Sequence, residues 1–290
     1  MAEACFLDHG RVAVDSAAAS AIVARRAVRS LYQELALYPK PGLVSLVDTG
    51  SHDDMDASTF VRSLFSLRRY FLDIALAGAR GSEFETLRLL GVDAERRMLA
   101  ATGGINTHRG AIFSLGMLCA AAGRASTSSW QPERLRATLV DCWGEALAGH
   151  RGPAASNGAA VRERHAAPGA REQAAAGFPA IFELALPTLR RTLASGRGLR
   201  CARIDTLFTL MAGLSDTNVY HRGGAEGARI VRETSSGFLE RGGTAAAGWE
   251  EEAVAAHRRF VAHRLSPGGA ADLLAATCFV HALSADMGPF

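Results

Sequence analysis

Residues 12–37 read VAVDSAAASAIVARRAVRSLYQELAL, and this stretch decides the fold class. Its apolar side chains return every three or four residues, as on one face of an α-helix, at Ile22, Val23, Ala27, Leu31 and Leu35. Two prolines, Pro39 and Pro41, follow directly, and proline cannot continue a helix. The stretch therefore predicts one amphipathic helix that ends just before the two prolines.

The rest of the chain repeats this helical pattern. We expect one helix that starts near Ser58 and one that ends at Ala101 with Gly91 as an interruption or kink. Further helices are expected over 109–122, 132–149, 178–193, 201–214, 225–235, 248–265 and 270–285. Alternating strand patterns and repeats of 20–50 residues are missing. The sequence predicts a single compact all-α multi-helix domain over residues 1–290, with a flexible Gly-, Pro- and Ala-rich loop near 151–170.

The composition excludes several classes of protein. The 290 residues carry 32 Lys and Arg against 29 Asp and Glu, so the net charge is +3, and the two signs are interspersed. This balance indicates neither a nucleic-acid-binding nor a membrane-binding surface. The five cysteines form no C-x-x-C pair, which is typical of a reducing compartment. Because no apolar run is long enough to span a bilayer and the first residues are acidic, we expect a cytoplasmic protein.

Common catalytic and nucleotide-binding motifs are also missing. The chain has no P-loop, no dinucleotide-binding glycine fingerprint, no H-E-x-x-H and no G-x-S-x-G. Polar residues gather instead at four breaks between the expected helices. The functional site is therefore expected in the loops that join helices.

The first break contains Lys40, the only lysine of the chain, between two prolines. The prolines restrict the backbone, which reduces the entropy lost when the ammonium group binds an anion. Glu34 lies just before this segment, and Asp53, Asp54 and Asp56 follow it. We interpret Asp56 as a helix N-cap, while Asp54 fits a cap and a functional role equally well.

The second break, residues 102–110, reads TGGINTHRG and opens an apolar helix. A Gly-Gly turn before free backbone N–H groups favours a phosphate site. Asn106, His108 and Arg109 add side-chain donors to this turn. A plain turn between helices explains the glycines and Asn106, but not all the polar groups together, so we favour a functional site.

The third and fourth breaks differ in how strongly they indicate a ligand-binding site. Arg171, beside Glu172, fits a surface ion pair when taken alone. At the fourth break Asp216, Asn218 and Arg222 fall on successive turns of one face if the helix continues. Such a face can hold a divalent ion on carboxylate and amide oxygens and a phosphate on the guanidinium. Asp216 as a simple cap is the alternative, and Asp272 is interpreted as an acid of an N-terminal helical turn.

Together these motifs resemble those of the triphosphoribosyl-dephospho-CoA synthases. The matching segments occur in family order between about Glu34 and Ala275, and they are specific only in combination. They are PKPGLV at 39–44, GSHDDM at 50–55, TGGINTHRGAIF at 102–113, GAR at 169–171, GFP at 177–179, DTN at 216–218, RGG at 222–224 and PGGAADLLA at 267–275.

The resemblance implies an all-α enzyme that joins ATP to 3′-dephospho-CoA and expels adenine. The product is the precursor of a prosthetic group carried by an acyl carrier protein. The chain has Ser45 where the citrate lyase type often has an acid, and it has Asp53 beside Asp54. It is therefore more similar to the type associated with malonate decarboxylase, and Asp48 is a candidate to replace the missing acid.

The resemblance also guides a hypothesis for the roles of the site residues. The transition state of the reaction that the resemblance implies should resemble an oxocarbenium ion. Such a reaction requires a base, a hydrogen-bond donor to adenine and cations for the triphosphate. Asp54 and Asp216 are the candidates for Mg²⁺ binding or general-base catalysis, and Glu34 is a further candidate base. Lys40, Arg109, Arg171 and Arg222 are assigned to phosphates, and His52, Asn106, His108 and Asn218 to ribose or adenine.

Two other functions use a similar set of residues. A magnesium-dependent ADP-ribosyl or nucleoside hydrolase would replace the ribose hydroxyl with water. A non-enzymatic nucleotide-binding or carrier-protein-binding module would bind ATP without consuming it, but it leaves the many acids unexplained.

A homodimer is a further expectation, because exposed apolar helix faces in all-α enzymes often form dimers.

Overall fold

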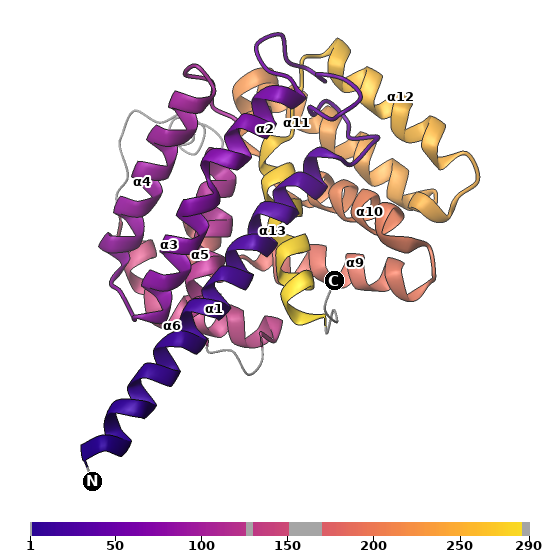
Figure 1. The fold of residues 1–290 in the computed structure, drawn as a ribbon. Helices are drawn as coiled ribbons and strands as arrows, with labels where there is room; N and C mark the ends of the chain where they lie inside the picture. Colours follow the sequence, from indigo (N-terminus) through magenta and orange to yellow (C-terminus); the bar gives the residue numbers. More distant parts are fainter. Residues whose placement is uncertain (1, 126–129, 151–169, 286–290) are drawn as a thin grey trace.

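The fold consists of helices that pack in two groups around one central helix (Figure 1). The computed structural model describes residues 2–125, 130–150 and 170–285. No strand occurs in these ranges, so the predicted all-α class is confirmed. The loop predicted near 151–170 lies outside the described residues, apart from Ala170.

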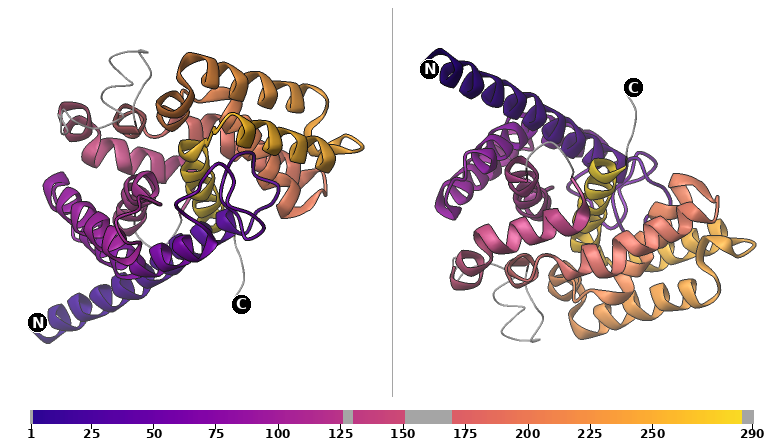
Figure 2. Two further views of the ribbon diagram at one scale, coloured as in Figure 1. Left: turned by 90° about the horizontal axis from the view of Figure 1, so that it is seen from above. Right: turned by 90° about the horizontal axis from the view of Figure 1, so that it is seen from below.

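The first group begins with α1 (Ala2–Leu35), which runs along one side and extends beyond the rest of the molecule at its amino-terminal end (Figures 1 and 2). It packs on α3 and α5. The other members are α2 (Ala57–Ser66), α3 (Arg68–Ala79), α4 (Phe84–Ala101), α5 (Arg109–Arg124), α6 (Pro132–Gly149) and α8 (Ala170–Ala175). Pro132 occupies the first turn of α6, where its missing N–H costs nothing.

The second group is built on α10 (Gly198–Gly213), which packs on α9 and α11. Its elements are η1 (Ala180–Ala185), α9 (Leu186–Ala194), α10, α11 (Thr217–Glu240), η2 (Gly243–Ala245) and α12 (Trp249–Ala262). Most of its buried side chains form a second apolar cluster, whereas Ile181 and Leu186 belong to the cluster of the first group.

The central helix is α13 (Gly268–Ser284), which lies between the two groups in all three views (Figures 1 and 2). Ala276, Phe279 and Val280 belong to the first cluster, whereas Leu274 and Cys278 belong to the second. A helix that is apolar on all sides is a buried helix. The two cores are thus joined through α13, and its amino-terminal end comes close to elements from both groups.

Several helix boundaries differ from the predicted ones. The helix expected from Ser58 is divided at Leu67, whose backbone N–H bonds to the carbonyl of Leu64, three residues back. Gly91 does not interrupt α4, which continues to Ala101 as predicted. The helix expected from Ala225 begins there, because Gly224, whose φ is 59°, is non-helical and separates it from a preceding helical segment that starts at Thr217. The two segments together form α11, and the preceding one was not expected as a helix of its own.

Candidate active site

The buried Lys40 is the centre of the first break. Its side chain is 1% exposed, and its Nζ lies 2.5 Å from Oε1 of Glu34, which is also buried. Burial raises the pKa of Glu34 and lowers the pKa of Lys40, and the charge of each partner opposes the shift of the other. The sole lysine is thus held inside the protein at the carboxyl end of α1.

The loop that carries Lys40 is fixed against α12. His257 Nδ1 donates a hydrogen bond to the Lys40 carbonyl at 3.0 Å, and its Nε2 lies 3.4 Å from Oδ1 of Asp48. The charge of Asp48 acts to raise the pKa of Lys40. Gly42 has a φ of 69°, and a Cβ there would collide with the Leu265 carbonyl oxygen. Glycine at this position therefore permits the loop to approach the end of α12 closely.

His108, just before α5, is the second buried polar residue of the site. Its side chain is 2% exposed, and its Nδ1 lies 2.6 Å from Ser63 Oγ. Its Nε2 is buried and has no hydrogen-bond partner among the described residues. Burial, with a smaller effect from the Lys40 charge, lowers the pKa of His108 to about 3. The imidazole is therefore neutral at physiological pH.

Asp272 places α13 next to the start of α5. The backbone amide of Ala111 hydrogen-bonds to its carboxylate, and a Cβ at Gly110 would collide with that carboxylate. Burial raises the pKa of Asp272, and the charges of Glu34 and Asp216 add to the rise. Three acids from different parts of the chain therefore interact electrostatically at one place.

Asp216 joins the amino-terminal ends of two helices. Its Oδ1 accepts the N–H of Asn218 at 2.9 Å, which caps α11, and its Oδ2 accepts the N–H of Ala270 in α13 at 3.1 Å. Burial raises its pKa, and the hydrogen bonds from the backbone oppose this rise. A Cβ at Gly269 would stand 3.0 Å from this carboxylate. Asp216 thus acts as a cap for both helices.

Arg222 and His52 connect the fourth break with the first. Arg222 Nη1 donates to the Ser51 carbonyl at 3.1 Å, and its Nη2 lies 3.0 Å from His52 Nδ1. His52 Nε2 lies 2.9 Å from Ser266 Oγ. Burial and the Arg222 charge lower the pKa of His52, while Asp54, 3.6 Å from its Nδ1, opposes this shift. The first and fourth breaks are therefore in contact, whereas a shared cavity for Lys40 and Arg222 stays a prediction.

The remaining predicted residues are held nearer the surface. Arg109 pairs with Glu95 of α4, and Asn106 Oδ1 accepts the Arg109 N–H at 3.2 Å. Arg171 Nη1 donates to the His150 carbonyl at 2.7 Å. Asp54 is 62% exposed. The assignments of Arg109, Arg171 and Asp54 to the substrate stay predictions.

The predicted cap at Asp56 is confirmed. Its carboxylate accepts the N–H of Thr59 at 2.8 Å at the start of α2. That hydrogen bond and those from the hydroxyls of Ser58 and Thr59 lower the pKa of Asp56 to about 2. The acid two residues away, Asp54, is thus not needed as the cap of this helix.

Two of these residues, Asp54 and Asp216, are the predicted ligands of a metal ion. Within 2–125, 130–150 and 170–285, no three His, Cys, Asp or Glu side chains lie close enough to hold a metal ion together. Both oxygens of Asp216 already accept backbone N–H groups. The prediction of Mg²⁺ on Asp54 and Asp216 is untested by these contacts.

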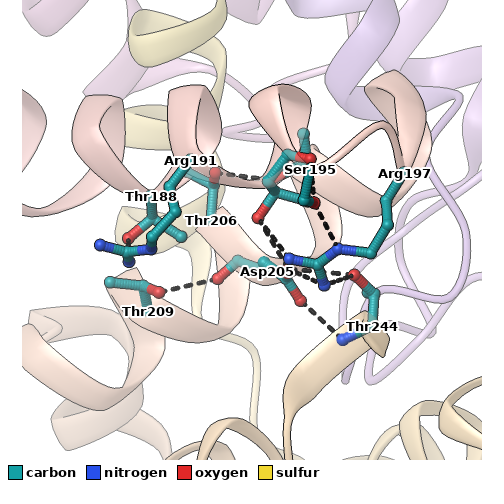
Figure 3. A network of polar contacts seen from close by, with 10 residues as sticks. Thr188, Arg191, Ser195, Arg197, Asp205, Thr206, Thr209 and Thr244 are labelled. Atoms are coloured by element: carbon teal, nitrogen blue, oxygen red, sulfur yellow. Dashed lines mark hydrogen bonds and ion pairs between the residues drawn. The ribbon is translucent and has the colours of Figure 1, made fainter. Parts of the chain in front are cut away.

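A second polar cluster lies away from these residues, around the buried Asp205 (Figure 3). Thr192 Oγ1 and Arg197 Nη1 bind its Oδ2 at 2.8 and 3.0 Å, and the backbone N–H of Thr244 binds its Oδ1 at 2.8 Å. A depression of about 450 Å³ adjoins this cluster and includes Arg191. Because the charge of Asp205 is paired with Arg197 and its oxygens are satisfied, the cluster ties α9, α10 and η2 together.

Three residues of the candidate site were missed by reasoning from the sequence. Ser63 and His257 lie inside helices with no distinctive neighbours, so no local signal marks them. Asp272 was interpreted as an ordinary first-turn acid, although its position after Pro267-Gly268-Gly269, a motif of the resemblance, could have singled it out. Their contacts span 45 to 217 residues of sequence, which local patterns do not encode.

The fold and these residues fit an enzyme of phosphorylated substrates. The amino-terminal ends of α5, α11 and α13 are linked through Asp216 and Asp272, and helix N-termini favour anions. Residues 20–289 match the model of the ATP:dephospho-CoA triphosphoribosyl transferase family, and the chain belongs to this family. The predicted transferase class, with ATP and dephospho-CoA as substrates, agrees with this family.

Curated relatives support the same assignment. A protein of Acinetobacter calcoaceticus is 39% identical over 87% of this chain and 87% of its own length. One of Stutzerimonas stutzeri is 40% identical over 94% of this chain and 95% of its own length. Both are named "Probable 2-(5''-triphosphoribosyl)-3'-dephosphocoenzyme-A synthase". No solved structure matches the chain significantly.

In the described part of the chain, no helix is both long enough and apolar enough to cross a membrane.

Proposed function

We propose that this chain transfers the triphosphoribosyl group of ATP to the 2′-hydroxyl of 3′-dephospho-CoA and releases adenine. The observation that carries the proposal is the convergence of the α5, α11 and α13 amino-terminal ends on acids that interact with the Lys40–Glu34 pair. Helix N-termini and an ammonium group suit the triphosphate, and a carboxylate suits the removal of a hydroxyl proton.

The proposed reaction exchanges one bond at the anomeric carbon of the ATP ribose. The 2′-oxygen of dephospho-CoA forms a bond to this carbon, and the bond from the carbon to adenine breaks with its electron pair going to adenine. A carboxylate takes the 2′-hydroxyl proton, and the departing adenine, which carries the electron pair of the broken bond, takes up a proton from solvent to become neutral adenine. Positive charge develops on the ribose in the transition state, as in glycoside transfer, and nearby carboxylates stabilise it.

Four acids are candidates for the base, and their surroundings differ. Asp216 uses both oxygens to cap helices, and Glu34 is paired with Lys40. Asp54 is mostly exposed and lies beside His52. Asp272 is half-buried and receives one backbone hydrogen bond, from Ala111. We therefore add Asp272 to the predicted candidates Asp54, Asp216 and Glu34 and favour it as the base.

Cations are needed for the triphosphate. Lys40 lies near the start of the loop that follows α1 and is paired with Glu34. Arg222 binds a later part of the same loop, because it donates to the Ser51 carbonyl, and this hydrogen bond orients its guanidinium group. Arg109 and Arg171 are the further predicted phosphate ligands, and both are held by contacts that a phosphate would have to replace. Asn106, Asn218 and His52 are proposed to orient the ribose or adenine.

A divalent cation is proposed to arrive with ATP, bound mainly to its phosphates. Asp272 interacts as a like charge with Glu34 and with Asp216, and Lys40 is the only lysine of the chain. A triphosphate next to these acids would be repelled without a further cation. Mg²⁺ characteristically binds one or two carboxylates together with substrate phosphates. When bound, it would neutralise phosphate charge, with Asp54 and Asp216 as the predicted protein ligands.

The destination of the product is proposed from the resemblance. Ser45 Oγ accepts the backbone N–H groups of Val47 and Asp48, and Asp48 provides the acid that acts on Lys40. This arrangement supports the type associated with malonate decarboxylase, whose acyl carrier protein receives the prosthetic group. A cytoplasmic location and a homodimer remain predictions from the sequence.

The test is to incubate the purified protein with ATP, 3′-dephospho-CoA and Mg²⁺ and to quantify adenine by chromatography and the conjugate by mass spectrometry. We expect adenine and 2′-(5″-triphosphoribosyl)-3′-dephospho-CoA in equal amounts. Adenine formed at the rate of a reaction without protein would overturn the proposal.

The same assay distinguishes the alternative functions. A magnesium-dependent ADP-ribosyl or nucleoside hydrolase would release adenine from ATP without dephospho-CoA and would form no conjugate. A nucleotide-binding module would bind ATP and release no adenine. Removal of Mg²⁺ with a chelator should reduce the rate if the cation acts as proposed.

A further inference from the structure

The imidazole of His108 has one bonded nitrogen and one without a partner. Nδ1 lies 2.6 Å from Ser63 Oγ, whereas Nε2 is buried and unpaired among the described residues. The ring meets that of Phe60 in a T-shaped arrangement, with the ring centroids 5.0 Å apart. A buried polar atom without a partner costs free energy, and such an atom in a native protein calls for an explanation, such as a ligand that binds there.

The order of the neighbouring hydroxyls decides which nitrogen of His108 carries the proton. Thr107 Oγ1 donates to Ser63 Oγ at 2.6 Å. The single hydroxyl proton of Ser63 is then available to His108, because an oxygen that accepts from Thr107 can donate to Nδ1. When Ser63 directs this proton to His108, Nδ1 accepts the hydrogen bond and the proton of the neutral ring is on Nε2.

The surroundings of Nε2 suit an uncharged aromatic heterocycle better than a phosphate. His108 is neutral because of its burial, and Phe60 and the sulfur of Met98, which accepts the His108 backbone N–H, lie next to it. The Lys40 ammonium is close enough to act on the ring electrostatically. A neutral N–H donor stabilises negative charge that develops on a leaving group without needing to be charged itself.

We propose that Ser63 is a positioning residue which, with Thr107, holds His108 as the Nε2–H tautomer, so that Nε2–H donates to the adenine that leaves from ATP. This inference rests on the proposed function, in which adenine is the leaving group. Ser63 does not touch the substrate and acts only through His108, which would contact it.

The tautomer can be observed without any activity. In protein labelled with ¹⁵N in the histidine rings, the signals of His108 are those that disappear in His108→Gln. We expect a protonated Nε2 and an unprotonated Nδ1, unchanged from pH 8 to pH 5. Replacement of Ser63 in Ser63→Ala should change the His108 pattern toward a mixture of tautomers. A wild-type ring with the proton on Nδ1 would overturn the proposal.

Kinetics test whether the tautomer matters for the reaction. Ser63→Ala should lower kcat by about 10- to 100-fold, the size of effect known when the hydrogen-bond partner that orients a functional histidine is removed, with little change in KM for either substrate. Ser66→Ala is the matched control, because Ser66 lies on the same helix and its hydroxyl binds the Ser63 carbonyl without reaching His108. Equal losses in both variants would contradict the positioning role.

A double variant separates positioning from stability. His108→Gln carries an amide N–H that needs no tautomer, so Ser63→Ala should cost little kcat when added to His108→Gln. An equal loss on both backgrounds would assign Ser63 a structural role. If wild-type protein released no adenine, the proposed function would fail while the NMR result still stood. If it released adenine with the proton on Nδ1, only the positioning role would fail.

Discussion

A buried ion pair is informative at the scale of single residues. Lys40 and Glu34 are removed from water together, and the desolvation of each charge is offset by the other over 2.5 Å. Lys40 is the only lysine of the chain, and it lies just after the carboxyl end of α1. A buried ammonium group does not contribute to the charged surface of the protein, so its position fits a role in the site and not in solubility.

Removal of one partner should be more harmful than removal of both. Lys40→Met leaves the Glu34 carboxylate buried without its cation, so we expect a loss of about 3–5 kcal/mol in the free energy of unfolding. The double variant Lys40→Met/Glu34→Gln should recover part of this loss. Urea unfolding measures both, and a single variant within about 1 kcal/mol of wild type would show that the pair is not truly desolvated.

His108 predicts how stability depends on pH. Its pKa is about 3 in the folded protein and about 6.5 in an unfolded chain. Between these values the unfolded state binds one more proton, so the contribution of His108 makes stability fall as the pH decreases from 6.5 toward 3. At pH above 6.5 both states are neutral at this residue, and its protonation contributes no pH dependence.

The variant His108→Gln should lack the pH dependence of stability that comes from protonation of His108. Between pH 6.5 and pH 4 the free energy of unfolding of wild type should fall more steeply than that of the variant, by about 1.4 kcal/mol per pH unit. Urea unfolding of both proteins at several pH values measures the difference. Parallel pH profiles would mean that His108 is accessible to water and protonates freely.

At the scale of elements, start and stop signals predicted the helices well where they are local. Pro132 begins α6, Asp56 caps α2, and the prolines after residue 37 end α1 near the expected place. The division at Leu67 was missed because Leu67 is an ordinary helix former, and its conformation depends on packing in the core. Tertiary contacts thus decided the boundaries that local signals did not.

Two helical glycines provide a matched test of how α5 and α13 meet. An added Cβ at Gly110 would collide with the Asp272 carboxylate, whereas at Gly91 in α4 the nearest atom is Tyr70 Oη, 3.7 Å away. Gly110→Ala should therefore displace Asp272 and lower kcat strongly. Gly91→Ala should leave activity intact and stabilise the protein by about 0.5–1 kcal/mol, because alanine favours a helix. Full activity in Gly110→Ala would remove Asp272 from the site.

The cluster around Asp205 should stabilise the second group of helices. Asp205→Ala leaves Arg197 without its buried partner and frees the 243–245 turn, so a loss of about 3–5 kcal/mol in the free energy of unfolding is expected. The control Asp93→Ala breaks exposed ion pairs with Arg96 and Arg97, which contribute at most about 1 kcal/mol. Calorimetry measures the melting temperatures of Asp205→Ala and Asp93→Ala. Equal melting temperatures would contradict a stabilising role for the cluster around Asp205.

At the scale of the whole molecule, α13 brings the site together. Its two faces join the two cores, and its first turns meet the start of α5 through Asp272 and the start of α11 through Asp216. The sequence indicated that polar residues gather at breaks between helices, and the resemblance grouped those breaks. Which breaks touch was not predictable, because the Arg222–Ser51 contact spans 171 residues.

A crystal structure of the wild-type protein with Mg²⁺ and ATP, without the second substrate, tests the central claim most directly. We expect the adenine ring within hydrogen-bond distance of His108 Nε2, and the triphosphate on the side of Lys40 and Arg222. ATP bound in the depression beside Asp205, or with its adenine away from His108, would contradict the account.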